Sequence, residues 1–168
     1  MLTLVGEDRP GIVAELTTAL YEGGCNLGEA TMMRLGGNFT IMLMVSCDKT
    51  RHAIESMVTP VAEKLHCRIH VDGIEGHLHQ HLEPDVRVVV NGADQAGIVS
   101  SVTKALADAG LNITQLETDV GGDESNPFYM MLIEGHSTNG VEALEAAMQG
   151  VDLGSLKVTI TPINTLIG

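Results

Sequence analysis

Apolar positions in the first half of the chain follow two different periods in turn. Four short segments have the continuous or alternating apolar residues of β-strands: residues 2–5, 27–35, 39–46 and 69–71. Two further segments repeat apolar residues at helical spacing: residues 12–20 and 54–65. Pro60 lies inside the second helical segment and is expected to kink or restart it. The segment Gly36-Gly37-Asn38 is typical of a tight hairpin turn between two strands. The pattern predicts the order β-α-β-β-α-β.

The second half of the chain repeats this order. Residues 6–26 (GEDRPGIVAELTTALYEGGCN) return as residues 92–112 (GADQAGIVSSVTKALADAGLN), an offset of 86 between Gly6 and Gly92. A repeat of this length indicates a whole fold unit that has been copied. Two βαββαβ units predict an α+β protein with two ferredoxin-like sandwiches in tandem. We expect a first domain over residues 1–73, a polar, His-rich linker over residues 74–84 and a second domain over residues 85–168.

The third strand of each unit is apolar on both of its faces. In a βαββαβ unit both helices cover one face of the sheet and leave the other face open. Apolar residues on an open face usually mark a contact surface, so we expect that face to be buried in a homodimer or a tightly paired two-domain unit. The residues expected on the helix-free faces are Met42, Met44, Met131 and Ile133.

Charge excludes one class of partner. The chain carries 22 acidic and 9 basic residues, a net charge of −13, and both halves are acidic. Direct binding to DNA or RNA needs a basic surface to neutralise phosphates, so no direct nucleic acid contact is expected.

Cys25, Cys47 and Cys67 are odd in number and lack metal-ligand spacing, which favours reduced thiols. With no signal peptide and no apolar stretch long enough for a membrane span, the sequence predicts a cytoplasmic protein away from membranes.

The turn between the first strand and first helix of each unit is the candidate site. A helix N-terminus presents unpaired N–H groups and partial positive charge, which favour a carboxylate. Gly11 and Gly97 would let a ligand approach the backbone closely. Asp8 and Asp94 could each hold an ammonium group or cap the helix, and capping is the more usual role of Asp at this position.

The same segments resemble a known family. The run Asp8–Val13 (DRPGIV) and the later LGGNFTIMLMVS resemble ACT domains, in particular the tandem ACT-domain family of the glycine cleavage system transcriptional repressor, over nearly the whole chain. The second copy has DQAGIV and lacks the Arg and the Pro, so the two sites need not bind a ligand equally. The resemblance implies an amino acid effector at the first turn and at a domain interface. It implies these ligand-binding positions: Asp8, Arg9, Pro10, Gly11, Ile12, Asn26, Asp94, Gly97, Ile98 and Asn112.

The resemblance also implies a function. It suggests a protein that senses an amino acid, with glycine as the guess, and regulates transcription by contacting a protein partner such as a DNA-binding transcription activator. No catalytic motif occurs in the sequence, so neither an enzyme activity nor a cofactor is expected. Two alternatives stay open. The chain could be the regulatory subunit of a metabolic enzyme, or a metal-binding adaptor that uses His77, His79 and His81, although a solvated linker explains this segment without a metal.

Overall fold

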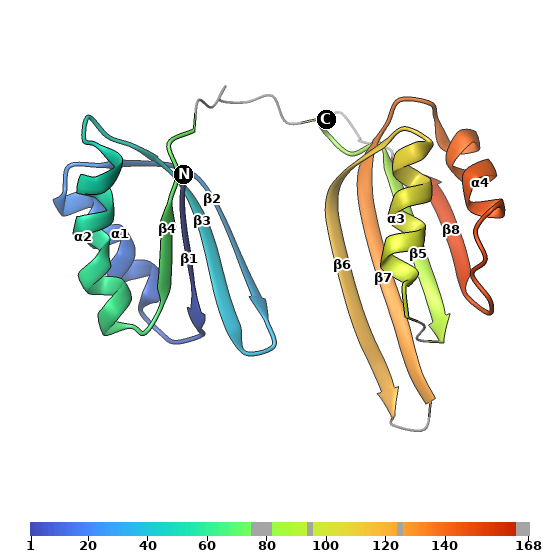
Figure 1. The fold of residues 1–168 in the computed structure, drawn as a ribbon, viewed down its shortest axis with the longest axis horizontal. Coiled ribbons are helices and arrows are strands. Elements are labelled where there is room, and N and C mark those ends of the chain that lie inside the picture. The colour runs from blue at the N-terminus through green and yellow to red at the C-terminus, as the bar shows by residue number, and fades with distance from the viewer. Residues whose placement is uncertain (75–81, 94–95, 124–125, 164–168) are drawn as a thin grey trace. The chain divides into compact units, whose positions relative to one another are not determined.

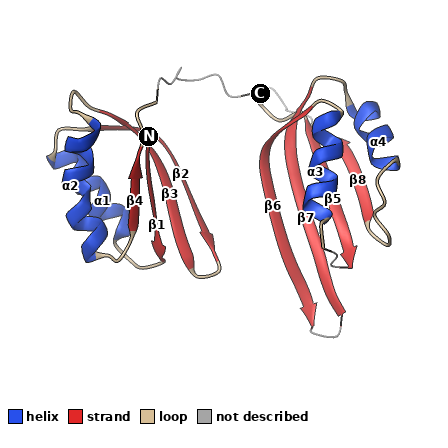
Figure 2. Ribbon diagram, viewed as in Figure 1, coloured by secondary structure: helices blue, strands red, loops and turns tan. Residues whose placement is uncertain are grey.

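The chain folds as two compact units, Met1–Leu78 and His79–Gly168. The computed structural model describes residues 1–74, 82–93, 96–123 and 126–163 (Figure 1). Each unit is a four-stranded antiparallel sheet with two helices on one of its faces (Figure 2). The α+β, ferredoxin-like prediction is therefore confirmed. The expectations for Asp94 and for His77, His79 and His81 lie outside the described residues.

The two units have the same element order and the same sheet topology. The first contains β1 (Leu2–Glu7), α1 (Ile12–Glu22), β2 (Asn26–Leu35), β3 (Asn38–Ser46), α2 (Arg51–Lys64) and β4 (Arg68–Val71). The second contains β5 (Val86–Ala93), α3 (Ile98–Asp108), β6 (Leu111–Asp123), β7 (Asn126–Ser137), α4 (Val141–Gln149) and β8 (Lys157–Pro162). The strand orders are β2-β3-β1-β4 and β6-β7-β5-β8.

The sequence explains these elements locally. Gly36 and Gly37 have φ angles of 56° and 77°, which only glycine adopts at little cost. They form the two-residue turn of the predicted hairpin between β2 and β3. Thr50 caps α2, since its hydroxyl accepts a hydrogen bond from the backbone N–H of Ala53 at 3.3 Å. The helix then runs through Pro60 without a break, so the expected restart at that residue is wrong.

Each core lies between the sheet and its helices. Alternate residues of the central strand β1, Leu2 and Leu4, are fully buried, as are Ile12, Leu16 and Leu20 along one face of α1. Each such aliphatic side chain contributes about 1.5–3 kcal/mol by leaving water. Among the described residues no helix is long and apolar enough to cross a membrane.

The helix-free face of the second unit differs from the expectation. Met131 and Ile133 were expected on it, but both are fully buried in the core. The expectation matched Met131 to Met42 and Ile133 to Met44, an offset of 89 residues. In the structure Phe39 lies opposite Gly6 and Tyr129 lies opposite Gly92, an offset of 90. An error of one residue turns every side chain of a strand to the other face, because the strand period is two.

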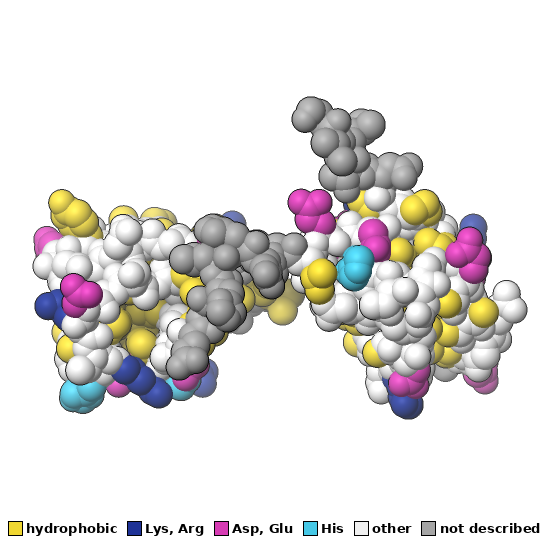
Figure 3. Space-filling model, turned by 90° about the horizontal axis from the view of Figure 1, so that it is seen from above, with side chains coloured by type: hydrophobic (Ala, Val, Ile, Leu, Met, Phe, Trp, Pro, Cys, Tyr) yellow, Lys and Arg dark blue, Asp and Glu magenta, His cyan; other side chains and the backbone are white. Residues whose placement is uncertain are grey.

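Both helix-free faces do carry exposed apolar side chains. In the first unit these include Val5, Met33 and Met42, and in the second Phe128 and Met130. A space-filling view shows apolar side chains at the surface of both units, with acidic and basic groups scattered among them (Figure 3). Burial of these faces in a homodimer stays a prediction.

The assignment of faces on β7 can be tested by one pair of substitutions. Ile133→Glu would place an unpaired charge in a fully buried position and should lower the free energy of unfolding of the second unit by more than about 3 kcal/mol. Met130→Glu on the opposite face, where the side chain is 43% exposed, should change it by no more than about 1 kcal/mol. Urea denaturation measures both; equal losses would contradict the observed register.

Candidate functional site

The chain leaves β1 and enters α1 through a turn that the hairpin holds in place. The backbone N–H of Asp8 donates to the carbonyl of Gly37 at 3.1 Å, which ties the turn to the β2–β3 hairpin. Gly11 is the N-cap of α1 with φ 91° and ψ −10°, in the left-handed region that favours glycine. No side chain caps this helix. The expectation that Asp8 caps α1 is therefore wrong, because the turn places Gly11 at the cap position.

Asp8 instead forms an ion pair with a residue of the neighbouring strand. Arg34 Nη2 lies 2.6 Å from Asp8 Oδ2. Arg34 reaches this point because β2 pairs with β3 so that it lies opposite Phe39, on the face that the helices cover. The Arg34 side chain is 69% exposed and that of Asp8 is 27% exposed. Exposed pairs of this kind stabilise a fold by only about 0–1 kcal/mol, so another partner can replace either member.

A second ion pair lies beside the first. Arg9 Nη2 donates to Glu7 Oε2 at 2.6 Å, and this hydrogen bond, helped by the opposite charge, holds the pKa of Glu7 below its ordinary value. Both groups are exposed. The turn therefore carries two guanidinium groups and two carboxylates within one short stretch of surface.

Three of these charged groups, those of Asp8, Arg9 and Arg34, line a cavity of about 390 Å³ at the start of α1. Its lining combines three kinds of group: a carboxylate, two guanidinium groups and apolar side chains. The first turn of α1 also contributes, and the first N–H groups of a helix have no partner within it. The lining residues are Asp8, Arg9, Gly11, Ile12, Val13, Ala14, Met32, Arg34 and Phe39. A small zwitterion with a carboxylate and an ammonium group matches this set of charges.

The structure brings together four of the residues implied for the first site. Asp8, Arg9, Gly11 and Ile12 line the cavity. Pro10 lies in the turn but not in the lining, and Asn26 begins β2, at the opposite end of that strand from Arg34.

The sequence reasoning missed the contribution of the two strands. Met32, Arg34 and Phe39 line the cavity from β2 and β3. The sequence does contain the information needed to place them, because a two-residue hairpin turn at Gly36 and Gly37 puts position 34 opposite position 39.

The N-cap of α3 in the second unit has nearly the same backbone conformation as the N-cap of α1, but the neighbouring strand carries a different side chain. Gly97 is the N-cap of α3 with φ 86°, no side chain caps that helix, and Ile98 is buried. Val120, opposite Tyr129, occupies the place that Arg34 has opposite Phe39. Asn112 is the second residue of β6 and lies opposite His136. The strand of the second unit therefore offers no cation at this position.

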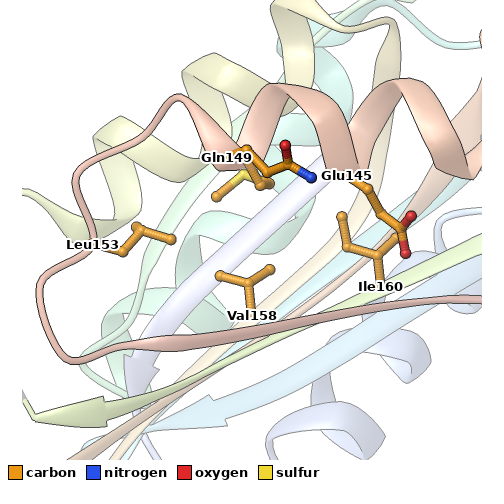
Figure 4. Close-up of a pocket in the computed structure, with 6 residues that line it drawn as sticks. Glu145, Gln149, Leu153, Val158 and Ile160 are labelled. Carbon is orange, nitrogen blue, oxygen red and sulfur yellow. The ribbon is translucent and has the colours of Figure 1, made fainter.

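A cavity of about 300 Å³ lies elsewhere in the second unit, between α4 and β8 (Figure 4). Glu145 and Gln149 of α4 lie above Val158 and Ile160 of β8. Its lining has a carboxylate and no basic group, so it matches an amino acid less well than the cavity at α1. In the described part of the chain no three His, Cys, Asp or Glu residues are placed to hold a metal ion.

Comparisons with known proteins identify both units. Residues 1–72 and residues 86–151 each match a model of the ACT domain. The glycine cleavage system transcriptional repressor of Escherichia coli (strain K12) is 31% identical over 118 residues. That alignment covers 69% of this chain and 62% of the relative, so the match spans less than two thirds of the relative's length.

Solved structures share the fold over nearly the whole chain. An unknown protein from Galdieria sulphuraria has a TM-score of 0.78 at 23% identity, covering 97% of this chain and 96% of its own. A candidate glycine cleavage system transcriptional repressor has a TM-score of 0.72 at 21% identity, covering 98% and 96%. At these identities the likeness shows the fold alone.

The geometry of the turn predicts how three substitutions change the stability of the first unit. Asp8→Asn and Arg34→Gln each remove one member of an exposed ion pair and should change the free energy of unfolding by less than about 1 kcal/mol. Gly11→Val has open space around the new side chain but imposes a left-handed backbone on a β-branched residue, so it should destabilise the first unit by about 1–3 kcal/mol. Thermal or urea unfolding measures all three variants. A neutral Gly11→Val would show that the turn relaxes without glycine.

Proposed function

The chain belongs to the ACT-domain family, as two such domains in tandem, and we propose that it is a regulatory protein that senses an amino acid. Glycine is the first ligand to test, because the curated relative is a glycine cleavage system transcriptional repressor. The observation that carries the proposal is the cavity at the start of α1, where Asp8 and Arg34 are held 2.6 Å apart beside the first helical turn.

The ion pair suggests how an amino acid binds. The ammonium group takes the place of Arg34 beside Asp8, and the carboxylate takes the place of Asp8 beside Arg34 and reaches the N–H groups of the first turn. Each protein charge keeps an opposite partner throughout, so neither is left unpaired. Gly11 has no atom within 4 Å of the position of a Cβ, which leaves room for the ligand backbone. Ile12, Met32 and Phe39 supply the apolar wall.

The two ACT domains are proposed to differ in this role. The first has Arg9 and Arg34, whereas the second has Gln95 and Val120 at the matching places. A carboxylate therefore gains a charged partner only in the first domain. We expect tight binding at the first site and weak or no binding at the second.

Regulation then requires that ligand binding change how this protein contacts another protein. A ligand that binds one arrangement of the protein better than another shifts the population toward it. The exposed apolar faces of the two sheets are the proposed contact surfaces, for a second copy in a homodimer and for a protein partner such as a DNA-binding transcription activator. No observation on the described residues favours the regulatory-subunit or metal-adaptor alternatives.

Ligand affinity should depend on both members of the ion pair. Arg34→Gln and Asp8→Asn should each weaken glycine binding at least about tenfold, because a hydrogen bond to a charged group contributes about 1.5–3 kcal/mol. Arg51→Gln is the matched control, since Arg51 is an exposed arginine of the same domain that pairs with Glu55. Isothermal titration calorimetry measures the three affinities.

Two ligand analogues test the contributions of the carboxylate and the ammonium group of glycine separately. Glycinamide lacks the carboxylate and N-acetylglycine lacks the ammonium group, and both should bind much more weakly than glycine to the parent protein. Equal affinity for glycine in the parent and both site variants would refute the site. If glycine fails, a thermal-shift screen of the other amino acids tests the same site, because a ligand of the native state raises the melting temperature.

The isolated protein should not bind DNA. A net charge of −13 repels the phosphate backbone, and only 9 of the 168 residues are Lys or Arg, which could release counterions from it. A gel-shift or fluorescence anisotropy titration with a promoter fragment at physiological salt should show no saturable binding. Salt-sensitive binding in the nanomolar range would contradict action through a protein partner.

A further inference from the structure

Two cysteines of the first unit lie side by side. Cys25 Sγ donates a hydrogen bond to Cys47 Sγ, and the two sulfur atoms are 2.7 Å apart. Both are free thiols in the structure. Cys25 follows the end of α1 and directly precedes β2, while Cys47 directly follows β3. The pair therefore lies at the open end of the β2–β3 hairpin, opposite the turn at Gly36 and Gly37.

The sheet itself brings these two positions together. Asn26 pairs with Ser46 across β2 and β3, so the next positions outward are Cys25 and Cys47. The second unit confirms the geometry of this place, because Leu111 and Ser137 pair directly across β6 and β7 there. Side chains directly opposite each other on an antiparallel pair have Cβ atoms about 4.5–5.5 Å apart, close to the separation that a disulfide spans.

We propose that Cys25 and Cys47 are a reversible disulfide site, oxidised by a low-molecular-weight disulfide such as oxidised glutathione. The thiolate of Cys47 attacks one sulfur of glutathione disulfide and releases one glutathione thiolate, which leaves a mixed disulfide on Cys47. The thiolate of Cys25 then attacks Cys47 Sγ and releases the second glutathione. The protein loses two protons and two electrons, and the glutathione disulfide gains them as two thiols.

The surroundings of the two thiols support this order. Cys47 is the more accessible of the two, and Cys25 is 6% exposed. Burial, and then the hydrogen bond with Cys47, raise the pKa of Cys25 to about 11, while Lys49 acts in the opposite direction. Cys25 is thus a protected thiol that a bulky disulfide reaches only through Cys47. The third cysteine differs, because Cys67 Sγ turns toward the carbonyl of Leu65.

The disulfide would tie together the two ends of the hairpin that carries Arg34 and Phe39. It would close a loop from residue 25 to residue 47. The bond would connect the segment that follows α1 to the segment that precedes α2. Closing such a loop restricts the unfolded chain and so stabilises the first unit. This property stands whether or not the cavity at α1 binds an amino acid.

The test uses the full chain. The protein is equilibrated with oxidised glutathione, quenched with acid, alkylated with N-ethylmaleimide in denaturant and analysed by peptide mass spectrometry. We expect one intramolecular cross-link between Cys25 and Cys47, alkylation of Cys67, and full reversal by dithiothreitol. The oxidised protein should melt about 5–15 °C higher than the reduced protein.

Two variants serve as controls. Cys67→Ser should keep the cross-link, whereas Cys47→Ser, which introduces the residue type found at Ser137 in the second unit, should abolish it while the variant remains folded by circular dichroism. The proposal is overturned if Cys25 and Cys47 are both alkylated after oxidation. It is equally overturned if only a stable mixed disulfide forms, if the cross-link involves Cys67, or if it joins two chains.

Discussion

Burial of one sheet face under two helices determines the rest of each unit. Leu2 and Leu4 of β1, like Val88 and Val90 of β5, are fully buried because the central strand faces the helices at every second residue. A shift of one residue would expose this whole set to water, so the register of the central strand is strongly specified. That register fixes where β1 ends, and it thereby places Asp8 next to the hairpin whose strands carry Arg34 and Phe39.

The comparison of the two copies separates what the fold requires from what it permits. Gly11 and Gly97 have nearly the same backbone conformation at the N-cap of the first helix of each unit, and only glycine takes that conformation at little cost. The side chains on the neighbouring strands are free to differ, and Arg34 corresponds to Val120. The first copy therefore carries Arg34 and a pair of thiols at places where the second copy has Val120, Leu111 and Ser137.

Much of this architecture could be predicted from the sequence. The helices, the hairpin at Gly36 and Gly37 and the duplication follow from local chemistry and periodicity, which act over a few residues. The orientation of β7 could not be predicted in the same way, because the β6–β7 hairpin is longer than the β2–β3 hairpin. Matching Met131 to Met42 therefore misplaces the strand by one residue. The partner of Asp8 was also missed, since a capping rule considers only the following helix, whereas Arg34 reaches Asp8 from another strand.

The ion pair at the start of α1 explains how the proposed amino acid site can carry both charges without loss of stability. A buried pair without ligand would lower the stability of the fold through desolvation of both charges. Asp8 and Arg34 avoid this because water still reaches them, and each neutralises the other at little gain or loss. In the proposed mode of binding, an incoming amino acid replaces both partners at once, so one weak pair is broken and two charge-assisted contacts form beside unpaired helix N–H groups. The same proposal gives a basis for selectivity: a ligand with only one of the two charges would separate the pair and leave one protein charge without a partner.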